Sequence, residues 1–149
     1  ELHILGEGPM EQRLRFTIQD LDLTKQVHLH GHVPPDEALR YLQGSDVFLL
    51  SSLSEGISNA VLEAMSCGLP VISTDCGGMS EAITNGVEGF LVPPRDPQAI
   101  AAALIKLAKN PSLRKRMGDA GRLRVLHHFR LEDQIDAFTA LFKNTVDPT

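Results

Sequence analysis

The sequence predicts an α/β fold in which a parallel β-sheet is flanked by helices and followed by further C-terminal helices. Short apolar runs recur along the chain, at residues 2–5, 27–30, 46–50, 70–74 and 89–92. Helical patterns lie between them, at roughly 11–19, 36–43, 59–67 and 79–84. Strands that alternate with helices in this way are typical of βαβ units. Three of the strand runs are almost continuously apolar, as expected where helices cover both faces of a parallel sheet.

After the last strand the pattern is helical only. Asp96 is a suitable N-cap, and Pro97 suits the first helical position. Apolar residues then repeat with helical spacing and predict one buried stripe, formed by Ile100, Ala103, Leu104, Leu107 and Ala108. Two further helices are predicted at about 112–128 and 131–143.

The composition predicts one globular domain that spans residues 1–149. A formal net charge of −5 argues against a nucleic-acid binder, because such proteins usually carry a basic surface. No apolar run approaches the ~20 residues that a membrane-spanning helix needs. Cys67 and Cys76 form no CxxC pair and no disulfide framework, which favours a reducing compartment such as the cytoplasm.

The stretch "EGISNAVLEAMSCGLP" (55–70) follows the third predicted strand. In an open parallel sheet, ligands bind beyond the carboxyl ends of the strands, so this loop is a candidate site. Ser58 is a plausible N-cap for a helix at 59–67, which Gly68 and Pro70 end. The amides from Ser58 to Val61 have no expected partners within the helix and carry the positive end of its dipole. They predict an anion site best suited to phosphate.

Two carboxylates flank this helix start. Glu55 can accept hydrogen bonds from sugar hydroxyls, while Gly56 lets a ligand approach the backbone closely. Glu63 lies at least one turn inside the helix and could hold a vicinal diol such as a ribose. From the spacing alone, the alternative is that both carboxylates are simply solvated.

The motifs in this region resemble a known family. The chain contains an E-x7-E motif (55–63), a GG-x-x-E segment (77–81) and an NG-x-x-G segment (85–89), in that order. With "LHILGEGP", "VHLHGHVP" and "SDVFLLSSLSEG", they resemble the C-terminal half of the retaining, two-domain (GT-B) glycosyltransferases of family 4. The resemblance covers nearly the whole chain and implies a Rossmann-like, nucleotide-sugar-binding domain.

The resemblance assigns roles residue by residue. Glu55, the candidate catalytic residue, would position the donor sugar through its hydroxyls, and Glu63 would bind the ribose. His32 and Val33 would meet the base through their backbone. The donor sugar and diphosphate would be bound by a continuous segment, Gly56, Ile57, Ser58, Asn59, Ala60 and Val61.

The implied reaction moves a hexose-type sugar from a nucleoside-diphosphate donor to a hydroxyl acceptor with retention. The resemblance implies neither a cofactor nor an essential metal ion. It also implies a fragment, because the family's first strand of this domain, with a diphosphate-binding arginine and lysine, would lie upstream of Glu1. The upstream acceptor domain would bind the glycan, lipid or small-molecule acceptor and make any membrane contact. We therefore expect residues 1–149 alone to be inactive.

Two alternatives remain open from the sequence. The chain could be a nucleotide- or nucleotide-sugar-binding module without catalysis, or part of a sugar epimerase with the same two-domain architecture. A G-R-x-x-x-x-K-like segment just before residue 1, in an upstream domain of similar size, would favour the transferase.

Three further features lead to structural expectations. His28, His30 and His32 alternate at strand spacing, but no third ligand set accompanies them, so no metal site is predicted. The basic segment at 114–130 is expected to be a solvated surface. In the family's sheet order the missing strand lies between those at 2–5 and 46–50. We expect these two strands to pair directly or to exchange with another molecule rather than to leave a gap.

Overall fold

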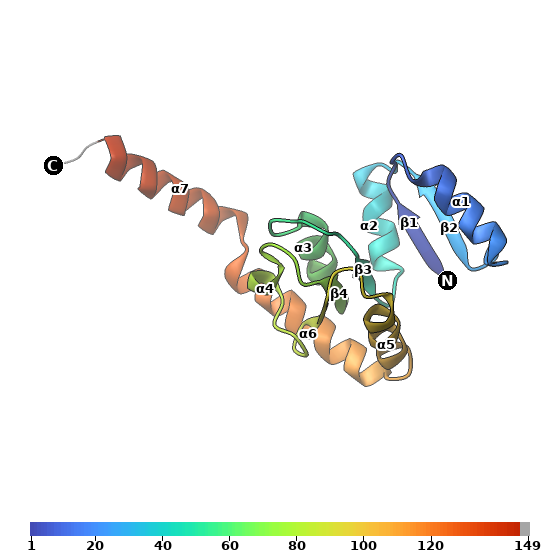
Figure 1. The fold of residues 1–149 in the computed structure, drawn as a ribbon. Coiled ribbons are helices and arrows are strands. Elements are labelled where there is room, and N and C mark those ends of the chain that lie inside the picture. Colours follow the sequence, from blue (N-terminus) through green and yellow to red (C-terminus); the bar gives the residue numbers. More distant parts are fainter. Residues whose placement is uncertain (147–149) are drawn as a thin grey trace. The chain divides into compact units, whose positions relative to one another are not determined.

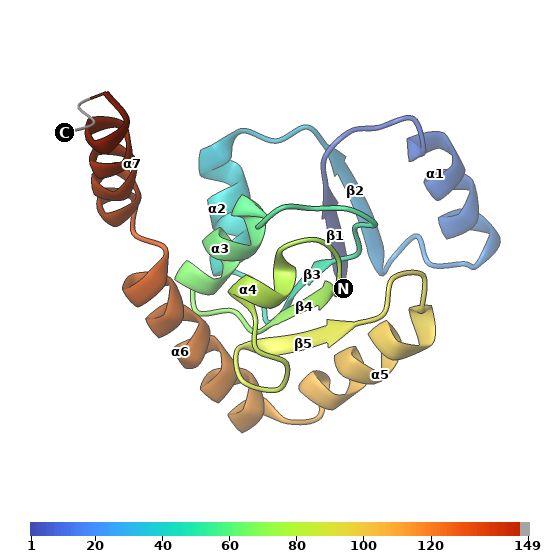
Figure 2. The same cartoon turned by 60° about the vertical axis from the view of Figure 1, so that its left-hand side comes forward.

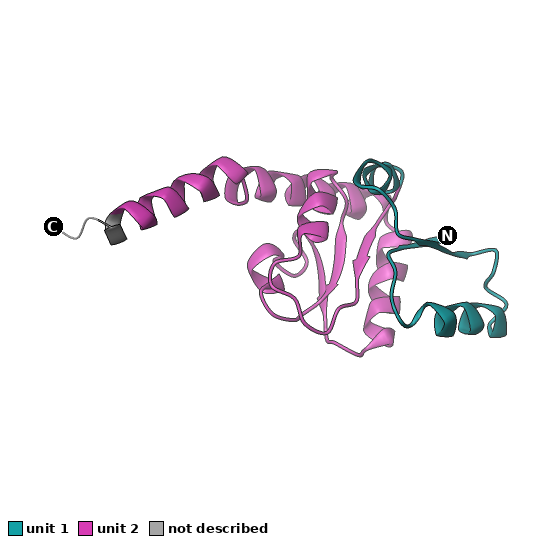
Figure 3. Ribbon diagram, turned by 90° about the horizontal axis from the view of Figure 1, so that it is seen from above, with its two compact units in different colours: residues 1–44 teal, residues 45–149 magenta. Residues whose placement is uncertain are grey.

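The computed structural model describes residues 1–146 and confirms the predicted α/β fold with helices on parallel sheets (Figures 1 and 2). The chain divides into two compact units, residues 1–44 and 45–149 (Figure 3). Unit 1 contains β1 (Leu2–Leu5), α1 (Glu11–Asp20), β2 (Val27–Gly31) and α2 (Pro35–Gln43). Unit 2 contains β3 (Phe48–Leu50), α3 (Asn59–Ser66), β4 (Val71–Thr74), α4 (Met79–Ala82), β5 (Gly89–Val92), α5 (Pro97–Ala108), α6 (Pro111–His128) and α7 (Leu131–Val146). None of the helices in the described chain is long and apolar enough to cross a membrane.

Within residues 1–146 the strands form two parallel sheets, in the orders β1-β2 and β3-β4-β5. Of the two expected arrangements, direct pairing of the strands at 2–5 and 46–50 is not found within these residues. Exchange with another molecule stays a prediction. β1 and β3 each keep an edge without a strand partner. The residues of β1 and β3 are half-buried or exposed, so water can satisfy their free backbone groups. This hydration lowers the cost that had favoured direct pairing.

The buried core lies in unit 2. One hydrophobic cluster joins the sheet to α5 and α6, and its buried members are Ile72, Val92, Ala103, Leu107, Leu113 and Met117. Val71 and Ser73 alternate with Ile72 along β4 and are also fully buried, so both faces of this central strand are covered. In unit 1, by contrast, every residue is half-buried or exposed.

The start of α5 agrees with its sequence pattern. Asp96 Oδ1 accepts a hydrogen bond from the Ala99 amide at 2.9 Å, and Pro97 is the first helical residue. The predicted stripe is confirmed at Ile100, Ala103 and Leu107, of which Ala103 and Leu107 are buried in the core cluster and Ile100 packs against it. Leu104 and Ala108 are exposed.

Two arginines of the basic segment are more than solvated surface. Arg114 Nη1 donates to the carbonyls of Leu107 and Ala108, at 2.8 and 3.2 Å, and so caps the C-terminal end of α5. Arg124 Nη2 donates to the Glu81 carbonyl at 2.8 Å, and Nη1 lies 3.5 Å from the buried Glu88 carboxylate. The expected solvated surface therefore does not describe Arg114 and Arg124, whose side chains bind carbonyls or a buried carboxylate.

Glu88 and Arg124 join the turn between α4 and β5 to α6. Glu88 is 5% exposed, and its Oε2 also accepts from the Thr84 amide at 2.7 Å. Removing one partner of a buried ion pair leaves an uncompensated charge. Removing Arg124 is therefore expected to cost more stability than removing one partner of an exposed pair on the same helix.

We expect Arg124→Met to lower the free energy of unfolding by about 3 kcal/mol, because it leaves the Glu88 carboxylate buried without its cation. Lys115→Met is the matched control, since it breaks an exposed pair with Asp119 on the same helix. The control should cost less than about 1 kcal/mol. Urea denaturation followed by circular dichroism measures both changes. Equal losses in the two variants would contradict the assigned role of Arg124.

Candidate donor-binding site

Two loops at the carboxyl edge of the unit 2 sheet touch each other closely. The loop at 51–58 leads from β3 to α3, and the loop at 75–78 leads from β4 to α4. A Cβ built on Gly77 would lie 1.6 Å from the carbonyl oxygen of Glu55. Gly77 also has φ +56°, a conformation that L side chains rarely adopt. Only glycine therefore permits this contact, which places Glu55 directly beside the loop after β4.

Glu55 is half-buried, and its carboxylate is anchored. Ser52 Oγ donates to Glu55 Oε1 at 2.7 Å. The Ser52 carbonyl in turn accepts from Thr74 Oγ1 at 2.5 Å and from Cys76 Sγ at 3.6 Å. Because Thr74 ends the buried strand β4, the carboxylate is tied through Ser52 to the best-packed part of the molecule. Its second oxygen, Oε2, accepts no hydrogen bond from the residues that the structure describes.

The N-terminus of α3 supplies free amides. Ser58 occupies the N-cap position of α3, but its side chain makes no capping hydrogen bond. Its carbonyl accepts from the amides of Val61 and Leu62, at 3.1 and 3.2 Å. The amides of Asn59 and Ala60 donate to no residue within the described range, and both residues are exposed. These two amides are available for an anion at the positive end of the helix dipole.

The position of Val61 corrects part of the predicted anion site. Its amide is occupied by the Ser58 carbonyl, and its side chain is fully buried. The first turn closes more tightly than a regular α-helix, so the free amides end one residue earlier than predicted. Val61 therefore anchors α3 in the core. Any contact that it makes with a donor stays a prediction.

Gly56 and Ile57 form the link between Glu55 and the helix. Gly56 is exposed, and no atom lies within 4 Å of a Cβ built on it, so a ligand can approach the backbone there. Ile57 is half-buried, and its Cγ1 would be 3.2 Å from a Cβ built on Gly78. Its side chain therefore packs on the loop after β4.

Glu63 is exposed on the second turn of α3. Burial raises the pKa of the Cys67 thiol, and the nearby Glu63 carboxylate raises it further, while Arg122 opposes the shift. Glu63 and Cys67 are four residues apart, so they lie on one side of the helix. The carboxylate is thus open to solvent, close to a half-buried thiol and free to meet a ligand.

His32 and Val33 lie in unit 1, directly after β2. The His32 amide donates to Glu7 Oε1 at 3.3 Å. The contact of these residues with a base stays a prediction.

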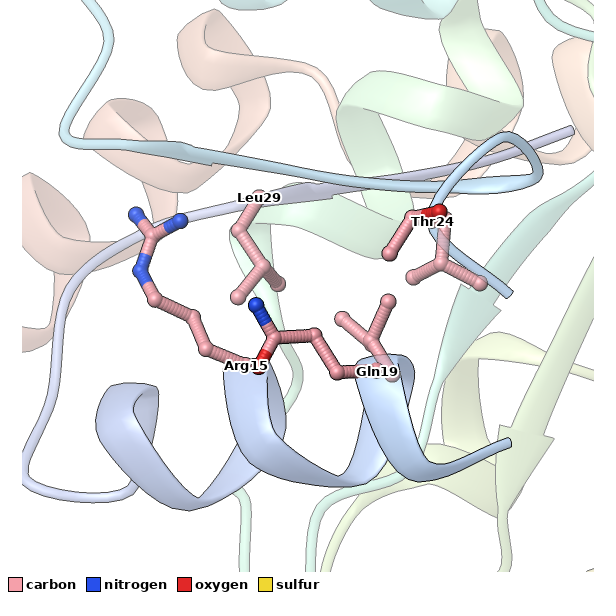
Figure 4. Close-up of a pocket in the computed structure, with 6 residues that line it drawn as sticks. Arg15, Gln19, Thr24 and Leu29 are labelled. Carbon is pink, nitrogen blue, oxygen red and sulfur yellow. The ribbon is translucent and has the colours of Figure 1, made fainter. Parts of the chain in front are cut away.

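Unit 1 contains a separate shallow pocket between α1 and β2 (Figure 4). It is lined by Arg15, Ile18, Gln19, Thr24, Val27 and Leu29. Gln19 points from α1 toward Leu29, whereas the Arg15 guanidinium pairs with Glu11 Oε1 at 2.7 Å. None of the predicted donor-site residues lines this pocket.

Sequence reasoning missed the residues that support Glu55. Ser52 and Thr74 carry no motif of their own, and their link depends on two strands lying side by side. Gly77 belongs to the "CGG" segment that directly follows the fourth strand, and a glycine pair at such a place is the available signal of a close backbone approach.

Comparisons with known proteins identify the family of this chain. The family model described as "Glycosyl transferases group 1" matches residues 1–124. The amylovoran biosynthesis glycosyltransferase AmsK of Erwinia amylovora is 44% identical over 115 residues, which cover 73% of this chain and 28% of AmsK. The chain thus spans less than a third of that relative's length.

Two solved structures share the fold. The sucrose-phosphate synthase of Thermosynechococcus elongatus superimposes with a TM-score of 0.91 at 26% identity, over 99% of this chain and 39% of that one. A TarM variant of S. aureus, in complex with fondaparinux, alpha-GlcNAc-glycerol and UDP, superimposes with a TM-score of 0.86 at 25% identity. The match covers 94% of this chain and 28% of the TarM chain. With a family match over residues 1–124, the chain belongs to the glycosyl transferases group 1 family.

Proposed function

We propose that this chain is the nucleotide-sugar-binding half of a retaining glycosyltransferase. The reaction transfers a hexose-type sugar from a nucleoside diphosphate to a hydroxyl acceptor. The observation that carries the proposal is the combination of two free amides at the start of α3 with an anchored carboxylate just before it. This arrangement offers hydrogen-bond donors for a diphosphate and an acceptor for sugar hydroxyls within one loop.

The free amides suit the departing group. As the bond between the anomeric carbon and the diphosphate breaks, negative charge grows on the leaving oxygen. The amides of Asn59 and Ala60 are already oriented by α3, so they stabilise this charge more as it develops. Their contribution therefore favours the transition state over the bound donor.

Glu55 acts on the sugar. Ser52 holds one carboxylate oxygen, which fixes the side chain and leaves the other oxygen for the donor's hydroxyl groups. Holding the sugar against the amides keeps its anomeric carbon in position for the acceptor. Glu63, one turn after Asn59 on α3, binds the ribose hydroxyls. The backbone at His32 and Val33 meets the base.

Several further observations support this proposal. The TarM variant is in complex with UDP, and AmsK is a glycosyltransferase by name. Cys67 and Cys76 are both free thiols, which fits a cytoplasmic protein. The proposal places the acceptor site in another part of a longer protein. The coverage of 28% of AmsK and 39% of the sucrose-phosphate synthase supports this placement.

The function is tested by donor turnover. Full-length protein containing this chain is incubated with a panel of nucleoside-diphosphate sugars and candidate acceptors, and nucleoside diphosphate release is measured. We expect acceptor-dependent release and a product with the donor's anomeric configuration. Residues 1–149 alone should bind donor at about millimolar concentration, near 4 kcal/mol, and transfer nothing. An inverted product, or robust transfer by residues 1–149 alone, would contradict the proposal.

Glu63→Ala should weaken nucleoside diphosphate binding by about 1.5–3 kcal/mol, the range for a hydrogen bond to a charged group. Calorimetry on the full-length protein measures the change. Asp133→Ala on α7 is the matched control, because it removes one exposed carboxylate outside the proposed site. If Glu63→Ala binds nucleoside diphosphate with unchanged affinity, Glu63 does not bind the ribose.

Cys67 gives an independent check of the Glu63 side chain. Because the Glu63 carboxylate raises the pKa of this thiol, Glu63→Gln should lower that pKa. More thiolate is then present at a given pH, so alkylation by iodoacetamide should become faster. The rate is measured across pH by mass spectrometry of the peptide that contains Cys67. An unchanged pH profile would mean that the Glu63 charge does not reach the thiol.

Glu55→Gln should separate sugar binding from nucleotide binding. The free nucleoside diphosphate lacks the hydroxyls that Glu55 accepts from, so its affinity should change little while donor turnover falls. Calorimetry and turnover are compared in the same variant. If both ligands weaken to the same extent, Glu55 belongs to the nucleotide site or has only a structural role.

A further inference from the structure

Unit 1 gathers imidazoles and a carboxylate at the amino ends of β1 and β2. His3 and His28 are register partners in the parallel pair. Their rings stack with centroids 5.0 Å apart, and the His3 ring also stacks on His30 at 5.1 Å. Glu1 Oε2 lies 3.7 Å from both His3 Nε2 and His28 Nε2. The structure thus supplies the further ligands that the spacing of His28 and His30 lacked.

We propose that Glu1, His3 and His28 form a zinc-binding site. Their ligand atoms all lie within 4.8 Å of one another. Zinc holds nitrogen and oxygen ligands at about 2.0–2.2 Å in tetrahedral geometry, which places neighbouring ligand atoms roughly 3.3 Å apart. Small rotations of the exposed Glu1 side chain and the two rings close the remaining difference. A water molecule would take the fourth position, because the site is open to solvent on the Glu1 side, 66% exposed.

The His28 ring has one nitrogen whose bonding needs are unmet, which suggests that it binds a ligand. Its Nε2 atom is buried, and no hydrogen-bond partner for it exists within the described residues. The nearest carboxylate oxygen, at 3.7 Å, is too far for a hydrogen bond. A metal ion between the two atoms would satisfy this nitrogen, which otherwise bears the cost of an unpaired buried polar group.

A hydrogen-bonded chain sets the tautomer of His3 for metal binding. His3 Nδ1 lies 2.9 Å from His30 Nε2, and His30 Nδ1 lies 2.9 Å from the Tyr41 hydroxyl. When Nε2 of His3 binds zinc, its Nδ1 carries the proton and donates to His30. His30 then carries its own proton on Nδ1 and donates to Tyr41. Metal-bound histidines usually have such a second partner, which fixes the ring.

The site would act on structure rather than on the transfer reaction. It lies at the amino ends of the strands, whereas ligands of open parallel sheets bind beyond the carboxyl ends. Zinc would cross-link β1 and β2 in the unit that has no fully buried residue. A metal that binds only the folded state stabilises it. We therefore expect zinc to protect the backbone amides of β1 and β2 from hydrogen exchange.

The test measures zinc affinity by competition with a chromophoric chelator, using zinc sulfate and the protein under reducing conditions. Wild type should bind zinc in equimolar amount. His3→Ala and His28→Ala should each weaken binding more than about 10-fold. His127→Ala, an exposed histidine on α6, is the matched control and should bind as wild type does. All variants keep both cysteines, and circular dichroism checks their folding.

His30→Phe tests the positioning role, because it keeps a ring for stacking but cannot accept the bond from His3. We expect it to weaken zinc binding by about 10–100-fold without changing the stoichiometry. Failure of wild type to bind, or equal binding by wild type, His3→Ala and His28→Ala, would overturn the site. Wild-type affinity in His30→Phe would overturn the role of His30.

Discussion

The contact between Gly77 and the carbonyl of Glu55 is the constraint on which the candidate site depends. It brings the loops after β3 and β4 together at the carboxyl edge of the sheet, at a separation that no side chain tolerates. Once the loops are held this way, Ser52 can reach both the Glu55 carboxylate and the hydroxyl of Thr74. The donor-site carboxylate is thereby connected to a fully buried strand rather than to a mobile surface loop.

Packing further along the chain keeps α3 in place. A Cβ on Gly118 would lie 1.9 Å from the carbonyl oxygen of Gly68, so α6 passes directly against the end of α3. Val61 and Met65, on the inner face of α3, are completely buried. The exposed amides of Asn59 and Ala60 are then fixed by the core behind them. Preorganised donors of this kind stabilise developing charge without having to reorganise during the reaction.

The sequence predicted the alternation of strands and helices because both periodicities are local. It also placed the α5 cap, since Asp96 and Pro97 act within one turn. The sequence could not show that the Val61 amide is already hydrogen-bonded. Its partner is the Ser58 carbonyl in a tight first turn, which residue types do not specify. Arg114 and Arg124 were expected to be surface charges. Their partners, which are carbonyls and a buried carboxylate, come from other elements and are not visible in the local sequence. The two separate sheets were missed for the same reason, because strand pairing depends on contacts distant in sequence.

The histidines of unit 1 show the same limit. Sequence spacing relates His28 to His30, whereas the parallel register relates His28 to His3. Pairs across strands become visible only when the register is known, and they define the proposed zinc site. The proposed donor site lies at the carboxyl ends of β3 and β4 in unit 2, and the proposed zinc site lies at the amino ends of β1 and β2 in unit 1.

Binding of the diphosphate at the N-terminus of α3 can be measured by titrating the ¹⁵N-labelled chain with UDP and following the amide chemical shifts in NMR spectra. We expect the largest shifts at Asn59 and Ala60, with smaller ones at Gly56. Shifts confined to the α1–β2 pocket, at Ile18 and Gln19, with none at the start of α3, would contradict this expectation.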